Sequence, residues 1–165
     1  MSMTAPIVAE LEQESAATLR LLERIPEGKL SWRPHPKSMS LGQLALHIAS
    51  TPGGLTQMAQ IDGIEVPDFT QPEATSLPQI LDTFHTSLAD AVAGLPKIED
   101  STLMKDWKVT KGDRVLLSMS RFGLLRGLLL NHLYHHRGQL TVYLRLLEVP
   151  LPPVYGRTAD ENPLQ

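Results

Sequence analysis

The longest predicted helix covers residues 121–148, whose sequence is RFGLLRGLLLNHLYHHRGQLTVYLRLLE. The segment contains no proline, which would remove a hydrogen bond inside a helix and clash with its preceding turn. It is apolar on most of its circumference. A helix of this kind is buried at the centre of a bundle or in a subunit interface, so the rest of the chain is expected to pack around it.

Three further helices are predicted upstream. The first covers residues 6–25, the second begins at Ser40, and the third begins at Ser76. Each of these two serines precedes a glutamine by three residues, which is the spacing of a capping box. The second helix is expected to kink or break at the Pro-Gly-Gly of residues 52–54. Together the four segments predict an all-α fold, a four-helix bundle.

The remaining segments contain few helical signals. Between the third and fourth helices, residues 101–120 predict a short hairpin or loop insertion that turns at Gly112. The tail after residue 148 is rich in proline and is expected to be extended. A chain of 165 residues is the length of one ordinary domain, so we expect a single domain over residues 1–165.

The charge balance excludes several classes of partner. There are 15 basic and 18 acidic residues and no run of lysine or arginine, so we expect binding neither to nucleic acid nor to a membrane surface. The absence of cysteine excludes disulfides, thiolate metal sites and a cysteine nucleophile. No apolar stretch has the length of a membrane span, and residues 1–14 lack the basic region of a signal peptide. A cytoplasmic protein is therefore expected.

Histidines in the fourth helix suggest a metal site. His132 and His136 are four residues apart, about 40° around the helix axis and about 6 Å along it, so both imidazoles lie on one face. Two ring nitrogens so placed can share one metal ion. His135 points about 100° away from His136. His47, in the middle of the second helix among apolar residues, is the candidate third ligand. On spacing alone, satisfied core histidines are the alternative interpretation.

Two segments of the chain resemble the DinB-like family. Residues 132–148, HLYHHRGQLTVYLRLLE, are similar to that family's last helix, and residues 30–50, LSWRPHPKSMSLGQLALHIAS, are similar to the region around the start of its second helix. The resemblance implies a four-helix bundle, often dimeric, that holds one divalent metal ion on three histidines. Carried over residue by residue, the ligands are His47, His132 and His136.

The family resemblance implies an enzyme that acts on a small molecule, and two reactions stay open. One is metal-dependent hydrolysis. The other is transfer or isomerisation through a low-molecular-weight thiol, which is slightly favoured because a metal deprotonates a thiol without help from a protein base. Zinc is the expected ion, and nickel also suits imidazole ligands. The catalytic acid and base are unassigned, and Glu14 is the one helix carboxylate that we nominate. The alternative is a non-catalytic metal-binding module of the stress response.

A homodimer is also expected. The fourth helix carries more apolar surface than packing against the other helices would bury, and the family resemblance also implies a dimer. The apolar residues that supply this surplus are Leu124, Leu128, Leu130 and Leu146.

Polar residues near the histidines have simpler interpretations. Gln139 lies one turn after His136, where it either contacts a substrate or is a core polar group. Arg137 and Arg145 are expected to tether the acidic residues of the tail, Asp160 and Glu161.

Overall fold

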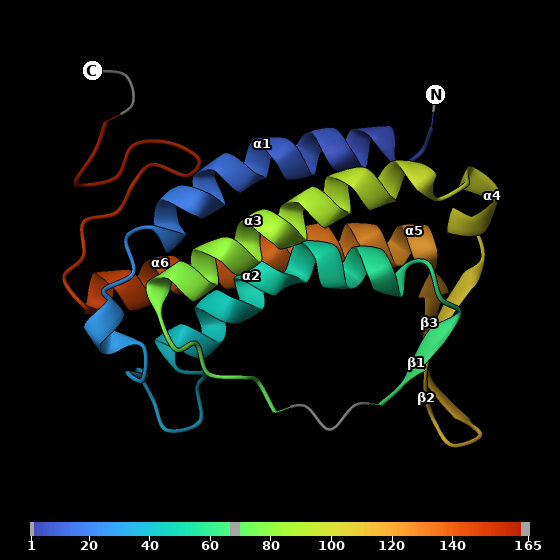
Figure 1. Ribbon diagram of the computed structural model, residues 1–165, viewed down its shortest axis with the longest axis horizontal. Coiled ribbons are helices and arrows are strands. Elements are labelled where there is room, and N and C mark those ends of the chain that lie inside the picture. Colours follow the sequence, from blue (N-terminus) through green and yellow to red (C-terminus); the bar gives the residue numbers. More distant parts are fainter. Residues whose placement is uncertain (1, 67–69, 163–165) are drawn as a thin grey trace.

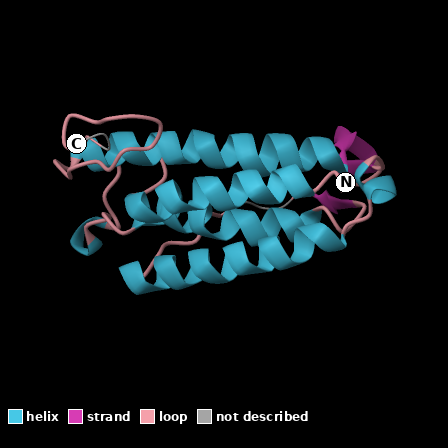
Figure 2. Ribbon diagram, turned by 90° about the horizontal axis from the view of Figure 1, so that it is seen from above, coloured by secondary structure: helices cyan, strands magenta, loops and turns pink. Residues whose placement is uncertain are grey.

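The computed structural model describes residues 2–66 and 70–162, and most of this part of the chain is helical (Figure 1). Four long helical segments lie side by side in both views (Figures 1 and 2). They are α1 (Ala5–Leu22), α2 (Leu41–Met58), α3 (Leu77–Gly94) and a composite last segment of α5 (Arg121–Leu124), η3 (Leu125–Asn131) and α6 (His132–Leu146). Shorter helical turns are η1 (Glu27–Lys29), η2 (Leu95–Lys97) and α4 (Asp100–Leu103).

Both predicted capping serines begin a helix. At the start of α2 the Ser40 hydroxyl accepts a hydrogen bond from the Gln43 backbone N–H (3.1 Å), and the Gln43 side-chain oxygen accepts one from the Ser40 N–H (2.9 Å). This is a complete capping box. At the start of α3, Ser76 accepts from the Gln79 N–H at 3.2 Å, while the Gln79 side chain instead accepts from the Thr75 N–H.

The fold is not purely all-α, because a three-stranded sheet lies at one end of the long helices (Figure 1). Strands β2 (Asp106–Lys111) and β3 (Arg114–Ser120) form the hairpin that residues 101–120 predict, and Gly112 turns it with a φ of 56°. Strand β1 (Gly63–Glu65) pairs in parallel with β2. This pairing corrects the all-α prediction, and it joins residues too distant in sequence for a local pattern to indicate it.

Helix α2 continues through the Pro-Gly-Gly of residues 52–54, where a kink or break was expected. Close packing against α3 stabilises α2 at the position where Pro52 would otherwise end it. The Gly53 backbone N–H donates to the Ser87 hydroxyl of α3 at 2.7 Å, and a Cβ at Gly53 would lie only 3.1 Å from that residue. The tertiary contact with α3 thus outweighs the local preference of Pro52 to end the helix.

The last long segment contains a π-helix, η3, directly before α6. The His132 backbone N–H donates to the carbonyl of Gly127, five residues earlier, where an α-helix would use the residue four back. The sequence gives no sign of this wider turn. Such turns are rare, and they occur frequently at functional sites.

Most of the apolar surface of the last segment is buried in the core of the chain. Leu124 and Leu130 are fully buried within the chain, and Leu128 is partly buried. Of the four leucines on which the dimer prediction rested, only Leu146 is exposed, with 57% of its surface accessible. No helix within the described ranges is both long and apolar enough to cross a membrane.

Candidate metal centre

Three half-buried histidines from two helices meet between α2 and α6. His47 comes from the middle of α2, His132 is the first residue of α6, and His136 follows one turn later. A ring nitrogen of each lies within 4.8 Å of the others. The ring centroids are separated by 5.1 Å for His47 and His132, 4.6 Å for His47 and His136, and 4.3 Å for His132 and His136. The three residues expected from the sequence are thus together.

The two histidines of α6 direct their Nε2 atoms at one another, 2.8 Å apart. Nitrogens bound to one tetrahedral zinc ion lie about 3.3 Å apart, so only a small adjustment separates this pair from a shared ion. The Nδ1 atom of His132 is buried without a hydrogen-bond partner among the described residues. The short distance between the two Nε2 atoms and the unpartnered Nδ1 atom of His132 both fit a cluster that holds a metal ion.

The environment keeps these rings uncharged. The pKa of His136 is lowered to about 4, chiefly by burial; the hydrogen bond with Gln139 opposes this shift, and the neighbouring histidines add to it. Burial, followed by the charge of His132, lowers the pKa of His47. Burial and the charge of His135 lower the pKa of His132. Because metal ions bind the neutral imidazole, this cluster is ready to bind one at neutral pH.

His135 stands outside the cluster, as its angle around the helix predicted. It is exposed, and its ring meets that of His136 edge-on at 5.0 Å. Within the described part of the chain, the group that can hold an ion consists of His47, His132 and His136.

A pocket of about 520 Å³ opens beside the histidines, and His47 and His132 form part of its wall. We call it the site pocket. The rest of its described lining comes from the second half of α2, from the sheet, from η3 and from residues 70–72. These residues are Ser50, Thr51, Gly54, Leu55, Met58, Ile64, Val66, Thr70, Gln71, Pro72, Trp107, Val109 and Leu128.

Glu14, the carboxylate nominated from the sequence, does not line this pocket. It is buried in α1, and its Oε2 accepts from the Arg137 guanidinium at 2.5 Å and from the Tyr155 hydroxyl at 2.8 Å. Arg137 is 1% exposed and is held by this pair, so it does not tether the acidic tail as expected. The tail is instead held by Arg145, which pairs with Asp160 at 2.5 Å as predicted.

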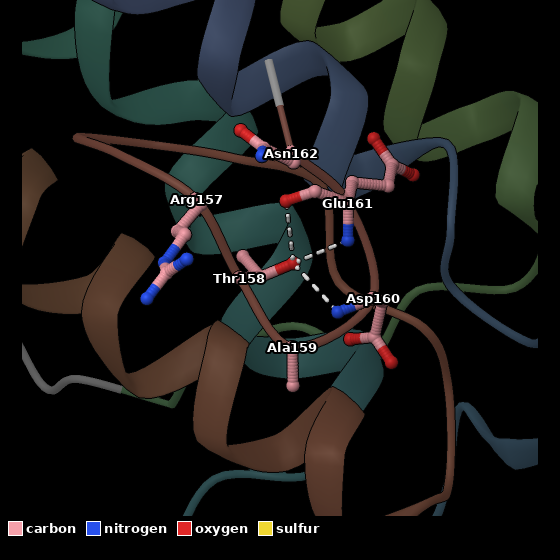
Figure 3. A pocket seen from close by; sticks show the side chains of 6 residues that line it. All are labelled: Arg157, Thr158, Ala159, Asp160, Glu161 and Asn162. Atoms are coloured by element: carbon pink, nitrogen blue, oxygen red, sulfur yellow. Dashed lines mark hydrogen bonds between the residues drawn. The ribbon is translucent and has the colours of Figure 1, made fainter. Parts of the chain in front are cut away.

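A second hollow, of about 650 Å³, lies within the C-terminal tail and contains none of the histidines (Figure 3). The Thr158 hydroxyl at its centre accepts from the backbone N–H groups of Asp160 and Glu161. These bonds, together with the ion pair between Glu161 and Arg24, fold the tail back onto the helices. The hollow is a feature of this turn and not a second metal centre.

Long helices that bring three uncharged histidines within reach of one ion define a mostly helical protein with a candidate metal centre. The chain belongs to the DinB family, whose sequence pattern matches residues 1–163. It is 27% identical over 150 residues to the uncharacterized protein YrdA of Bacillus subtilis (strain 168). The aligned region covers 91% of this chain and 86% of that protein.

Solved structures agree on the fold. A DinB-like protein from Bacillus cereus ATCC 10987 superposes with a TM-score of 0.69 and 25% identity, covering 90% of this chain and 95% of the other. The DinB-like protein YjoA from Bacillus subtilis gives a TM-score of 0.68 and 22% identity, covering 93% and 99% of the two chains.

Sequence reasoning missed the part of the site that comes from the sheet. Ile64, Trp107 and Val109 all line the site pocket, and the region from residue 60 to residue 120 had given no site assignment. One usable signal was Trp107, a large aromatic residue in a predicted hairpin that is otherwise rich in polar residues. Its 1% exposure reveals a packing role that the sequence alone does not.

Proposed function

We propose that this protein is a metal-dependent enzyme acting on a small molecule, with His47, His132 and His136 as the ligands of one divalent ion per chain. The supporting observation is that nitrogens of these three rings lie within 4.8 Å of one another, while two of the rings line a pocket of about 520 Å³. Zinc is the first expectation and nickel the second. The proposal takes the chain as one cytoplasmic domain, a four-helix bundle that forms a homodimer.

An ion held by three neutral histidines would act as a Lewis acid toward a fourth ligand, either water or a thiol. The protein's own groups prepare the site for it. Gln139 accepts a hydrogen bond from the Nδ1 of His136 at 2.7 Å, which leaves Nε2 of that ring as the ligand atom. Apolar side chains from α2 and the sheet line the pocket beside the histidines.

The reaction that we favour is thiol-dependent transfer. Hydrolysis needs a group that moves protons at the nucleophile and the leaving group. None of the described residues lining the site pocket is an acid or a lysine, and the carboxylate of Glu14 is paired with Arg137. A thiol coordinated as thiolate makes a smaller demand on the protein, because it ionises without a protein base.

The test begins with metal analysis of the untagged protein. We expect about one ion per chain in the wild type and in His135→Ala, and a loss of orders of magnitude in affinity in His47→Ala, His132→Ala and His136→Ala. Retention of the metal by His47→Ala together with its loss by His135→Ala would make the ligand assignment wrong.

Turnover is then measured on ester, amide and electrophilic substrates, with and without an added low-molecular-weight thiol. Activity that requires both thiol and metal supports the transferase. Metal-dependent hydrolysis without thiol, lost in His136→Ala, would establish the hydrolase instead. Bound metal without activity in any assay would favour the non-catalytic metal-binding module.

A further inference from the structure

The walls of the site pocket are built from apolar side chains that converge from three elements. Leu55 and Met58 come from α2, Trp107 and Val109 from β2, and Leu128 from η3. Each is at least partly buried within the chain. The small sheet therefore forms one wall of a chamber, the helices form others, and residues 66 and 70–72 complete the described lining.

Polar atoms in these walls are largely committed to the protein itself. The hydroxyls of Ser50 and Thr51 donate to the carbonyl of His47 at 3.3 and 2.7 Å. The backbone carbonyl of Gln71 accepts from the Gln43 side chain at 3.0 Å. Away from the histidines, the buried Trp107 Nε1–H has no hydrogen-bond partner among the described residues, so it is a donor that the chamber wall can offer to a ligand.

Apart from His47 and His132, the described lining contains neither a basic nor an acidic side chain. An ionised group placed against such a wall would lose its hydration without gaining a partner, which is costly. The volume of about 520 Å³ lies in the range of small-molecule pockets, roughly 300–1,000 Å³.

We propose that the site pocket binds an uncharged, predominantly apolar organic molecule whose polar end faces His47 and His132. The orientation of the polar end toward the histidines depends on the proposed function. The binding of the apolar part depends only on the apolar residues that line the pocket. A thiolate would bind at the metal ion, and the molecule seated against the apolar walls is the uncharged reaction partner.

The experiment uses a matched pair of probes. N-phenyl-1-naphthylamine is uncharged, and 8-anilinonaphthalene-1-sulfonate is the same scaffold with one sulfonate. Because the chain has two tryptophans, Trp32→Phe leaves Trp107 as the reporter, and energy transfer from Trp107 to the bound probe measures occupancy. Trp32 packs edge-on against Tyr143, 5.8 Å between ring centroids, and lies outside the pocket lining.

The neutral probe is expected to bind at least tenfold more tightly than the sulfonate, both in metal-loaded and in chelator-treated protein. Val109→Asp should weaken binding of the neutral probe at least tenfold. The control Val115→Asp, at a 50% exposed position on the same hairpin, should leave binding unchanged.

Gly54→Phe provides a second variant that does not introduce charge. A Cβ at Gly54 would meet no heavy atom within 4 Å, so this position in the pocket lining has room for a side chain. Equal affinity for the two probes, or neutral-probe binding unaffected by both pocket variants, would overturn the inference. Neutral-probe binding that persists in a His136→Ala protein with no metal would uphold it even where the proposed metal function fails.

Discussion

The Nδ1 atom of His136 lies 2.7 Å from the side-chain oxygen of Gln139, nearly one turn further along α6. An amide oxygen only accepts hydrogen bonds, so the His136 ring carries its proton on Nδ1. Its Nε2 lone pair is then directed toward the Nε2 of His132 at 2.8 Å. A hydrogen-bonding group behind a histidine ligand fixes both the tautomer and the ring orientation.

Replacing Gln139 with leucine should therefore weaken metal binding about 10- to 100-fold, because the His136 ring loses the group that orients it. Gln139→Glu should restore most of the affinity, since a carboxylate accepts the same hydrogen bond. Affinity is measured by competition with a chelator of known strength, and Gln13→Leu on the exposed side of α1 is the control. Unchanged affinity in Gln139→Leu would contradict the role assigned to this contact.

The stability of the metal-free protein should fall as the pH is lowered from about 6.5 to about 4. In the folded chain burial depresses the pKa of His136 to about 4, while an unfolded imidazole titrates near 6.5. The unfolded state therefore binds more protons in this window, so protons favour unfolding. The contribution of His136 is fully present above about pH 6.5 and is lost as the pH falls through about 4.

Urea unfolding at several pH values measures this effect. His136→Gln should show a shallower loss of unfolding free energy across the window than the wild type. His35→Gln, at an exposed residue before α2, should follow the wild-type curve. Identical slopes for the wild type and His136→Gln would rule out the assigned cause.

The buried pair of Arg137 and Glu14 should be costly to break. Replacing Arg137 with methionine leaves the Glu14 carboxylate without its cation in a site that is only 9% exposed, and such changes cost about 3–5 kcal/mol. The double variant with Glu14→Gln should be more stable than Arg137→Met alone, because no unpaired charge remains. Denaturant unfolding measures both.

The surface pair of Arg145 and Asp160 is the matched control. Because the Arg145 side chain is 44% exposed, Arg145→Met should change the free energy of unfolding far less than Arg137→Met does. Similar losses for the two arginine variants would show that burial does not distinguish the pairs.

The proposed homodimer should use the outer face of α6. Val142 and Leu146 are four residues apart on this helix, and each is 57% exposed. Light scattering should give twice the 18.2 kDa chain mass for the wild type and the monomer mass for Leu146→Glu. Val115→Glu, at a 50% exposed position on β3, should leave the dimer intact. A wild-type monomer at micromolar concentration would remove the proposal.

Patterns within short stretches of sequence predicted the helix starts and the helix faces, because these features depend on neighbouring residues. Capping serines placed the starts of α2 and α3, and helical spacing put His132 and His136 on one face while turning His135 away. His47 required more, since nothing in the periodicity of α2 indicates which residue of another helix it faces. The family resemblance supplied that pairing, and the structure brings the three rings together.

The missed features depend on contacts between distant segments. Strand β1 exists because residues 63–65 meet residues 108–110, and Gly63 permits an approach in which a Cβ would lie 2.3 Å from the Lys108 carbonyl oxygen. The continuity of α2 through Pro52 likewise depends on Ser87 of α3. The pairing of Arg137 with Glu14 instead of the acidic tail was equally invisible, because charge alone does not reveal which partner is buried.

The π turn of η3 sets the angular position of the candidate centre. Such a turn contains one residue more than an α turn, and one residue corresponds to about 100° around the helix axis. If η3 became a regular α-helix with its sequence unchanged, α5 would stay in place while His132 and His136 rotated together relative to His47, although no histidine had changed.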